Sequence, residues 1–260
     1  MTQIREMIYT SKIIKAGALL TDTKTFFANW NVTLSVSENL DKFRQENLFG
    51  KASRSRVEDI LAIFRQRYLK EESVTKALIT LVNCKFPAEG LNSILYFHST
   101  QSDSLLHDVV TDLLLSLHGL GRHDINVSDV KNWINKQIAQ GKTQTSWSDR
   151  TITGCAREIL STLRDFGILK GASKKYLTPI YLPVQAFAYI ALYLKQRQPS
   201  GEKLINSTEW QLFFLSTKAV ESFFVEAHQH RLLEYYAAGS IIRIEFPTNS
   251  LEEYANVIAS

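Results

Sequence analysis

The sequence has few cysteines and no long hydrophobic run, and these two absences narrow the classes of protein it can belong to. Its two cysteines, Cys84 and Cys155, lie far apart and have no partners at metal-ligand spacing. No zinc site is therefore expected, and the low cysteine usage favours a reducing cytoplasm. The most hydrophobic run, Tyr181–Leu194, is shorter than the roughly 20 residues that span a bilayer and predicts a buried helix.

The start of the chain lacks the pattern of a secretory leader, because Arg5 and Glu6 are not followed by a sustained apolar core. Hydrophobic residues make up 45% and charged residues 22% of the 260 residues. These are ordinary values for a globular protein and exclude wholesale disorder. We therefore expect a soluble cytoplasmic protein with no membrane association.

Motifs of the common enzyme classes are missing as well. Gly50-Lys51 and Gly141-Lys142-Thr143 resemble part of a phosphate-binding loop, but each lacks the required earlier glycine and neither follows a predicted strand. The six histidines form no zinc-binding pattern, and neither a nucleophile elbow nor a dinucleotide fingerprint occurs. No catalytic residue, metal, cofactor or small-molecule substrate is therefore expected.

The charge is small overall but uneven along the chain. The formal net charge is +4 at pH 7. Residues 42–70 are rich in lysine and arginine, whereas glutamate dominates from residue 202 onward. A basic front and an acidic back favour a polyanionic partner, with ordinary solvated helix faces as the alternative.

The first of two basic elements is a predicted helix-turn-helix. A helix from Ser37 ends at Gly50, and Ser55 with Glu58 predicts a capping box at the start of the next helix. The helix dipole and the free backbone amides favour phosphate at such a start. Helical hairpins are also common for purely structural reasons. The candidate DNA-binding residues here are Lys51, Arg54 and Arg56.

The second basic element is the stretch Trp147–Leu182. Ser146 or Ser148 caps a helix with one apolar face, which Gly167 ends. Two short strands, Ile168–Lys170 and Tyr176–Leu182, are predicted to follow as a hairpin. The polar stripe opposite the apolar face and the hairpin tip contain these candidate DNA-binding residues: Arg150, Thr153, Arg157, Ser161, Arg164, Lys174 and Lys175.

Two helices precede this stretch, so the predicted order is that of a winged helix: three helices and a hairpin. Gly154 beside the polar stripe would allow a partner to approach closely. Arginines in a major groove can read guanine, while lysines on the backbone mainly position a protein. The alternative is a surface helix whose arginines serve solubility.

The predicted fold class is mainly α: a multi-helix globular protein with two helix-turn-helix elements, one of them winged-helix-like with a short β-hairpin. We expect three regions, 1–100, 101–195 and 196–260, with one compact body as the alternative. The stretch Glu6–Phe27 predicts one or two helices. Thr217–Ala238 predicts a long helix and Ile241–Phe246 a strand.

Four stretches together resemble the BrxA family, a core component of BREX bacteriophage-exclusion systems. They span nearly the full length, so the resemblance concerns the whole chain, and its specificity depends on their joint occurrence and order. The stretches are YTSKIIKAGALLTDTKTFFANW, ENLFGKASRSRVEDILAIFRQRYL, DVKNWINKQIAQGKTQTSWSDRTITGCAREILSTLRDFGILKG and ESFFVEAHQHRLLEYYAAGSIIRIEF.

The resemblance implies a cytoplasmic, nearly all-helical, non-enzymatic protein that binds double-stranded DNA. It also implies a BREX setting, in which host DNA is methylated and unmodified phage DNA is blocked, with other BREX proteins as further partners. A scaffold that bridges BREX subunits is the main alternative. RNA binding is a second one, because basic helices alone do not distinguish the polymers, and an enzyme is a weaker third.

Overall fold

The computed structural model of the chain describes residues 8–198, 200–239 and 241–260. Arg5 and Glu6, which underlie the expectations about a leader and about the first helix start, lie outside them. The chain forms two compact units. Unit 1 contains the residues up to Leu19 and Ser99–Ile180, and unit 2 contains Leu20–His98 and Tyr181–Ser260. The units alternate along the chain, whereas the sequence predicted three consecutive regions.

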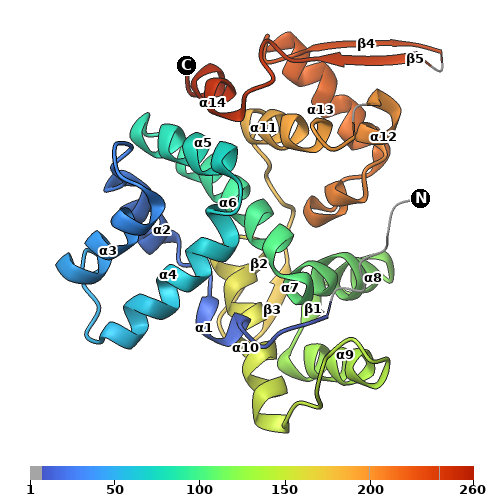
Figure 1. The fold of residues 1–260 in the computed structure, drawn as a ribbon. Helices are drawn as coiled ribbons and strands as arrows, with labels where there is room; N and C mark the ends of the chain where they lie inside the picture. Colours follow the sequence, from blue (N-terminus) through green and yellow to red (C-terminus); the bar gives the residue numbers. More distant parts are fainter. Residues whose placement is uncertain (1–7, 199, 240) are drawn as a thin grey trace. The chain divides into compact units, whose positions relative to one another are not determined.

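Helices dominate both units, and the strands form two small antiparallel sheets (Figure 1). The predicted mainly α fold class is therefore confirmed, as is the presence of a short β-hairpin. Among the described residues, no helix combines the length and the apolar character that crossing a membrane requires. The helix α6 (Ala88–Ser102) begins in unit 2 and ends in unit 1.

The remaining helices of unit 1 surround a three-stranded sheet whose strand order is β1-β3-β2. Strand β1 was not predicted, and the strand expected to reach Leu182 ends at Leu177. A π-helical segment, η1, separates α7 from α8. The elements are α1 (Ile13–Ala16), α7 (Ser104–Asp108), the π-helix η1 (Val109–Leu114), α8 (Leu115–Gly119), β1 (Asp124–Ile125), α9 (Val127–Ala139), α10 (Asp149–Asp165), β2 (Leu169–Lys170) and β3 (Lys175–Leu177).

The helix α10 is amphipathic and packs its apolar face against α9 and β2. Ser148 is its N-cap, and the Ser148 hydroxyl accepts a hydrogen bond from the backbone N–H of Thr151. Gly167 adopts a φ of +85° just after the helix, the left-handed conformation expected of a glycine at that position. The buried residues of α10 include Ile152, Ala156, Ile159 and Leu163.

A cluster of aromatic side chains joins the first three helices of unit 2. The rings of Phe26, Phe43, Phe49 and Phe64 lie within 6.3 Å of one another from centroid to centroid in each contact of the cluster. The elements are α2 (Leu20–Ala28), α3 (Val36–Glu46), α4 (Arg54–Tyr68), α5 (Glu72–Asn83), α11 (Val184–Lys195), α12 (Gly201–Ile205), the 3-10 helix η2 (Thr208–Phe213), α13 (Thr217–Gln229), β4 (Glu234–Ala238), β5 (Ile241–Glu245) and α14 (Leu251–Ala259).

The helix predicted over Thr217–Ala238 is wrong beyond Gln229. Arg231 adopts a left-handed φ of +59°, and residues 234–238 form β4, which pairs with β5. Tyrosines favour a pleated strand, and the pairing satisfies backbone groups that an isolated helix end would leave open. The predicted strand at Ile241–Phe246 is confirmed by β5.

A buried histidine lies in the core of unit 2. The Nε2 of His98 is 3.1 Å from the hydroxyl oxygen of Tyr189. Burial, with a smaller contribution from the charge of Arg197, lowers the pKa of His98 from 6.5 to about 3. This imidazole is therefore neutral throughout the physiological pH range.

Candidate nucleic-acid interface

The predicted polar stripe of α10 lies on one face of the helix, opposite the buried face. Arg150 and Arg157 are exposed. Within residues 8–198, 200–239 and 241–260 neither of them forms an ion pair. Arginine side chains in this state keep their donors available for phosphate or base edges. These two residues are the strongest part of the candidate interface.

The other stripe residues are held by neighbours on α10. The Thr153 hydroxyl donates to Asp149 Oδ2 at 3.3 Å. Arg164 pairs with Asp165 at 2.7 Å and donates to the Ser161 hydroxyl oxygen at 3.3 Å. These contacts orient the polar side chains, but they also place two carboxylates beside the stripe. The carboxylates lower its net positive charge.

Asp149, in the first turn of α10, also pairs with Lys131 of α9 at 2.8 Å. The hydrogen bond from Lys131 lowers the pKa of Asp149 below its usual value. The carboxylate therefore stays charged at neutral pH. A negative charge at a helix start stabilises the helix. Asp149 therefore stabilises α10 but weakens the attraction of this surface for a polyanion.

Gly154 does permit a close approach, but helix α1 occupies that side of α10. A Cβ atom at Gly154 would lie 3.2 Å from Cδ1 of Ile14. Contacts between α1 and α10 are extensive. The suggestion that Gly154 admits an external partner is thus corrected: the glycine leaves room for the side chain of Ile14 from α1.

The hairpin β2–β3 places its two lysines differently. Lys174 is exposed at the tip. Lys175 is 8% exposed, and its ammonium group donates to the carbonyl oxygen of Ala172 within the hairpin. Gly171 adopts a φ of +100°, and a Cβ atom there would lie 2.1 Å from the carbonyl oxygen of Lys174, so the turn requires glycine. Lys174 faces solvent, while Lys175 closes the hairpin.

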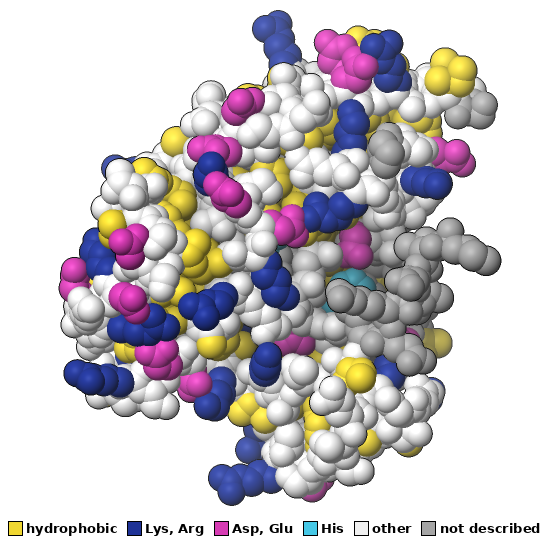
Figure 2. All heavy atoms as spheres, in the orientation of Figure 1, with side chains coloured by type: hydrophobic (Ala, Val, Ile, Leu, Met, Phe, Trp, Pro, Cys, Tyr) yellow, Lys and Arg dark blue, Asp and Glu magenta, His cyan; other side chains and the backbone are white. Residues whose placement is uncertain are grey.

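The first basic element is formed by α3 and α4 in unit 2, and two of its cations are paired with carboxylates. Lys51 pairs with Asp22 at 2.8 Å. Arg44 pairs with both Asp41 and Glu58, at 2.7 Å and 2.8 Å. Figure 2 shows basic and acidic side chains interleaved over this part of the surface. The element is therefore less positive than its content of lysine and arginine predicts.

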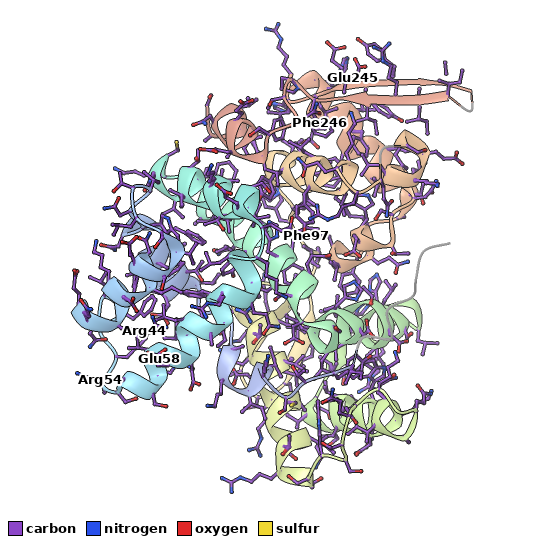
Figure 3. All side chains as sticks on the ribbon, in the orientation of Figure 1. Arg44, Arg54, Glu58, Phe97, Glu245 and Phe246 are labelled. Carbon is purple, nitrogen blue, oxygen red and sulfur yellow. The ribbon has the colours of Figure 1, made fainter. Side chains whose placement is uncertain are left out.

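The start of α4 differs in detail from the prediction. Its N-cap is Ser53, whose hydroxyl accepts from the backbone N–H of Arg56, so the capping box predicted for Ser55 and Glu58 is wrong. Arg54 is exposed and Arg56 half-buried. Figure 3 labels Arg54, Arg44 and Glu58, which line a hollow of about 220 Å³ between α3 and α4.

A second hollow, of about 440 Å³, lies at the base of the β4–β5 hairpin in unit 2. Its lining includes His228, Arg231, Glu234, Glu245 and Phe246, the last two labelled in Figure 3. These side chains include both positive and negative charges, and the positive ones are not clustered. This hollow is thus a poor match for a polyanion.

Groups suited to metal or thiol chemistry are scarce in the part of the chain that the structure describes. No cluster of three or more histidine, cysteine, aspartate or glutamate side chains there could hold a metal ion. Cys155 is fully buried. Burial, and then the nearby Asp103, raises the pKa of its thiol to about 12. Cys155 is therefore a packing residue with an unreactive thiol.

Sequence reasoning missed the two lysines of the α1 segment. Lys12 and Lys15 are exposed. Lys12 immediately precedes α1 and Lys15 lies within it, and α1 packs on α10. The helix α1 has four residues, too few for a periodic pattern to reveal its partner. The sequence signal that pointed to this packing was Gly154, which was assigned to an external partner.

The predicted residues divide between the two units. Lys51, Arg54 and Arg56 lie in unit 2, and the other seven lie in unit 1. No curated protein matches the sequence. The sequence profile of the BrxA family matches residues 7–192. Because this match covers more than half of the chain, the chain belongs to the BrxA family, whose members are components of BREX phage-defence systems.

Proposed function

We propose that this chain is the non-enzymatic, double-stranded DNA-binding component of a BREX system and that it works in the cytoplasm. The single observation that carries the proposal is that Arg150 and Arg157 on α10 are exposed and form no ion pair with any residue that the structure describes. In a phage-defence system, the polyanion that must be distinguished is DNA. A cationic helix face is the feature such a ligand requires.

The order of elements around α10 supports the proposal. The sequence of elements β1, α9, α10, β2, β3, with β3 central in the sheet, is that of a winged helix, in which the helix before the hairpin enters the major groove. In this assignment α10 is the recognition helix and Lys174 lies at the tip of the wing. Lys175 is left out of the proposed contacts, because its ammonium group is engaged within the hairpin.

The α3–α4 element is proposed as a secondary contact. Arg54 is exposed at the first position of α4, where the backbone amides and the helix dipole attract phosphate. Lys51 and Arg56 flank it. Two neighbouring cations, Lys51 and Arg44, are paired with carboxylates, so we expect this element to strengthen binding without setting its position on the duplex.

Titration of duplex DNA by fluorescence anisotropy over a salt series tests the proposal. The double variant R150E/R157E should weaken binding at least about tenfold, and the slope of log affinity against log salt should fall by about 0.9 for each phosphate that the protein no longer neutralises. The matched control is K203E/K218E, which makes the same change of charge on exposed residues of α12 and α13. Wild-type protein that does not bind duplex even at low salt would remove the proposal.

A protein-interaction scaffold is the second candidate, favoured by the β4–β5 hairpin. Ile241 and Tyr236 are 72% and 51% exposed, and exposed apolar side chains of this size suit a contact with another BREX protein. DNA binding that is absent at every salt concentration would favour the scaffold. Direct competition between duplex DNA and folded RNA separates the proposal from RNA binding.

A further inference from the structure

The segment Tyr9–Ala18 is attached to the loop that precedes α10. Tyr9 pairs in parallel with Thr143, and its backbone N–H donates to the carbonyl oxygen of Lys142 at 2.8 Å. The Tyr9 hydroxyl donates to Oδ2 of Asp108 at 2.5 Å. The ammonium group of Lys142 donates in turn to the Tyr9 hydroxyl oxygen at 3.2 Å. One side chain thus connects the N-terminal segment, helix α7 and the loop before α10.

The contact between Tyr9 and Asp108 is buried, and both groups keep their protonation states at neutral pH. Tyr9 is 3% exposed, and burial, followed by the hydrogen bond to Asp108, raises its pKa above the usual range. Burial alone would raise the pKa of Asp108, but hydrogen bonds from His107 and Tyr9 outweigh it and lower that pKa. A protonated hydroxyl and a charged carboxylate therefore face each other at neutral pH.

Two close contacts define how α1 runs along α10. Ile14 lies against Gly154, and a Cβ atom at Gly17 would be 3.0 Å from Oε1 of Glu158. Later residues of the Tyr9–Ala18 segment therefore meet later residues of α10, so α1 and α10 run in the same direction. Lys12, which precedes Ile14, lies toward the start of α10, the end that carries Arg150.

Helical geometry places α1 on the flank of the arginine stripe. At 100° per residue, Gly154 and Glu158 lie to one side of the face that Arg150 and Arg157 occupy. The stripe itself stays uncovered, since both arginines are exposed. A helix in a major groove has a phosphate backbone on each flank, so a cation on the flank of α10 would meet phosphates and not base edges.

We propose that the segment Tyr9–Ala18 is part of the DNA interface, with Lys12 and Lys15 contacting backbone phosphates beside the groove that α10 enters. This inference rests on the proposed function. Both lysines are exposed, and Lys12 forms no ion pair within the described residues. Lysine suits this role, because its ammonium group is a flexible point charge that fits phosphate without bidentate geometry.

The first test compares K12A/K15A with the wild-type full chain in the anisotropy titration. The salt slope should fall by about 0.9 for each phosphate that is no longer neutralised, and affinity should fall several-fold. The decrease should be equal on two duplexes of unrelated sequence, because phosphate contacts carry no sequence information. K203A/K218A is the control of equal charge. A slope and affinity that match the control would overturn the inference.

The second test displaces α1 and leaves every cation in place. Gly154→Leu inserts a side chain where Ile14 packs, so α1 should lift from α10 and DNA binding should weaken. Adding K12A/K15A to G154L should then cause little further decrease in affinity, whereas fully additive effects would contradict the inference. Circular dichroism monitors the fold. Should G154L fail to fold, Y9F replaces it in the same cycle, with the same two outcomes.

Failure of the inference is distinguishable from failure of the proposed function. If the wild-type chain does not bind duplex DNA, the proposed function falls and the inference falls with it. If R150E/R157E weakens binding while K12A/K15A does not, α10 remains the proposed interface and the N-terminal segment is excluded from it. Loss of binding in both variants, with the controls unchanged, supports both proposals.

Discussion

The α3–α4 element and the α10 element look alike in sequence and differ in the structure. Each has a helix that begins after a serine N-cap, Ser53 or Ser148, and carries arginines in its first turns. Around α3 and α4, two cations pair with carboxylates: Lys51 with Asp22 and Arg44 with Glu58. On α10, Arg150 and Arg157 have no such partner within the described residues.

The difference shows that the pairing of cations, and not their number, decides what a polyanion meets. An ion pair offers little net charge at a distance, and its partner must be displaced before phosphate can replace it. The α10 element is therefore expected to dominate DNA binding. Four measurements test this comparison between the two elements and the units that contain them.

The largest expected effect concerns the stability of unit 2 at low pH. The pKa of His98 is lowered from 6.5 to about 3 in the folded state, so the unfolded chain binds the extra proton between these values. The stabilisation is complete above pH 6.5 and is lost as pH falls toward 3. At pH 4.5 the loss is about 3 kcal/mol, at 1.36 kcal/mol per pH unit.

On acidification, unit 2, which contains the α3–α4 element, should therefore unfold at a higher pH than unit 1, which contains the α10 element. Hydrogen exchange measured over a pH series reports the opening of each unit. His98→Gln retains an amide partner for Tyr189 and cannot titrate, so it should remove most of this acid sensitivity. His123→Gln, at an exposed position, is the control. If His98→Gln leaves the pH profile unchanged, another group controls the acid response.

The second effect compares the two elements directly. R150A/R157A should weaken duplex binding about 10- to 100-fold, because exposed arginines with free donors make the proposed groove contacts. K51A/R54A should weaken it about threefold or less, since Lys51 already pairs with Asp22. Anisotropy titrations at one salt concentration measure both. The reverse order would break the ranking.

The third effect tests the attachment of the loop before α10. Tyr9→Phe removes the hydroxyl that donates to the charged Asp108 and should lower the free energy of unfolding by about 2 kcal/mol. Hydrogen exchange should accelerate in the loop 140–148 and stay unchanged in the turn 47–53 of unit 2. Equal acceleration in both segments would show a global loss of stability instead of a local release.

The smallest effect should come from Glu58→Gln. This change removes the carboxylate that pairs with Arg44. The guanidinium charge is then no longer neutralised by Glu58 and can attract a polyanion. We expect affinity for duplex DNA to rise about two- to threefold, in line with the modest energy of an exposed ion pair. Arg44→Ala in the same background should abolish the gain. No change in affinity would place this surface outside the interface.

Sequence patterns predicted helices well where apolar residues are continuous along a face, as in α10 and α11. They failed at Thr217–Ala238, where aromatic residues fit either a helix or a strand and pairing with β5 decides. They also missed β1, whose two residues exist as a strand through their pairing with β3. Local pattern is insufficient where the hydrogen-bond partner is distant in the chain.

In the candidate site too, local features were predictable from the sequence and contacts between distant residues were not. The stripe on α10 was predictable, because residues three and four apart share a helix face. The inward turn of Lys175 and the pairing of Lys51 with Asp22 were not, because each depends on atoms brought close by folding. Neither the distance to a carboxylate nor the burial of a side chain can be read from spacing.

By itself, the sequence determined the helical class of this protein, the amphipathic α10 with its arginines, and membership of the BrxA family. These properties depend on local periodicity and on the order of residues. The tertiary structure decided which cations remain available and that α1 lies against Gly154. Those outcomes depend on contacts between segments far apart in the chain, where packing and ion pairing are settled together.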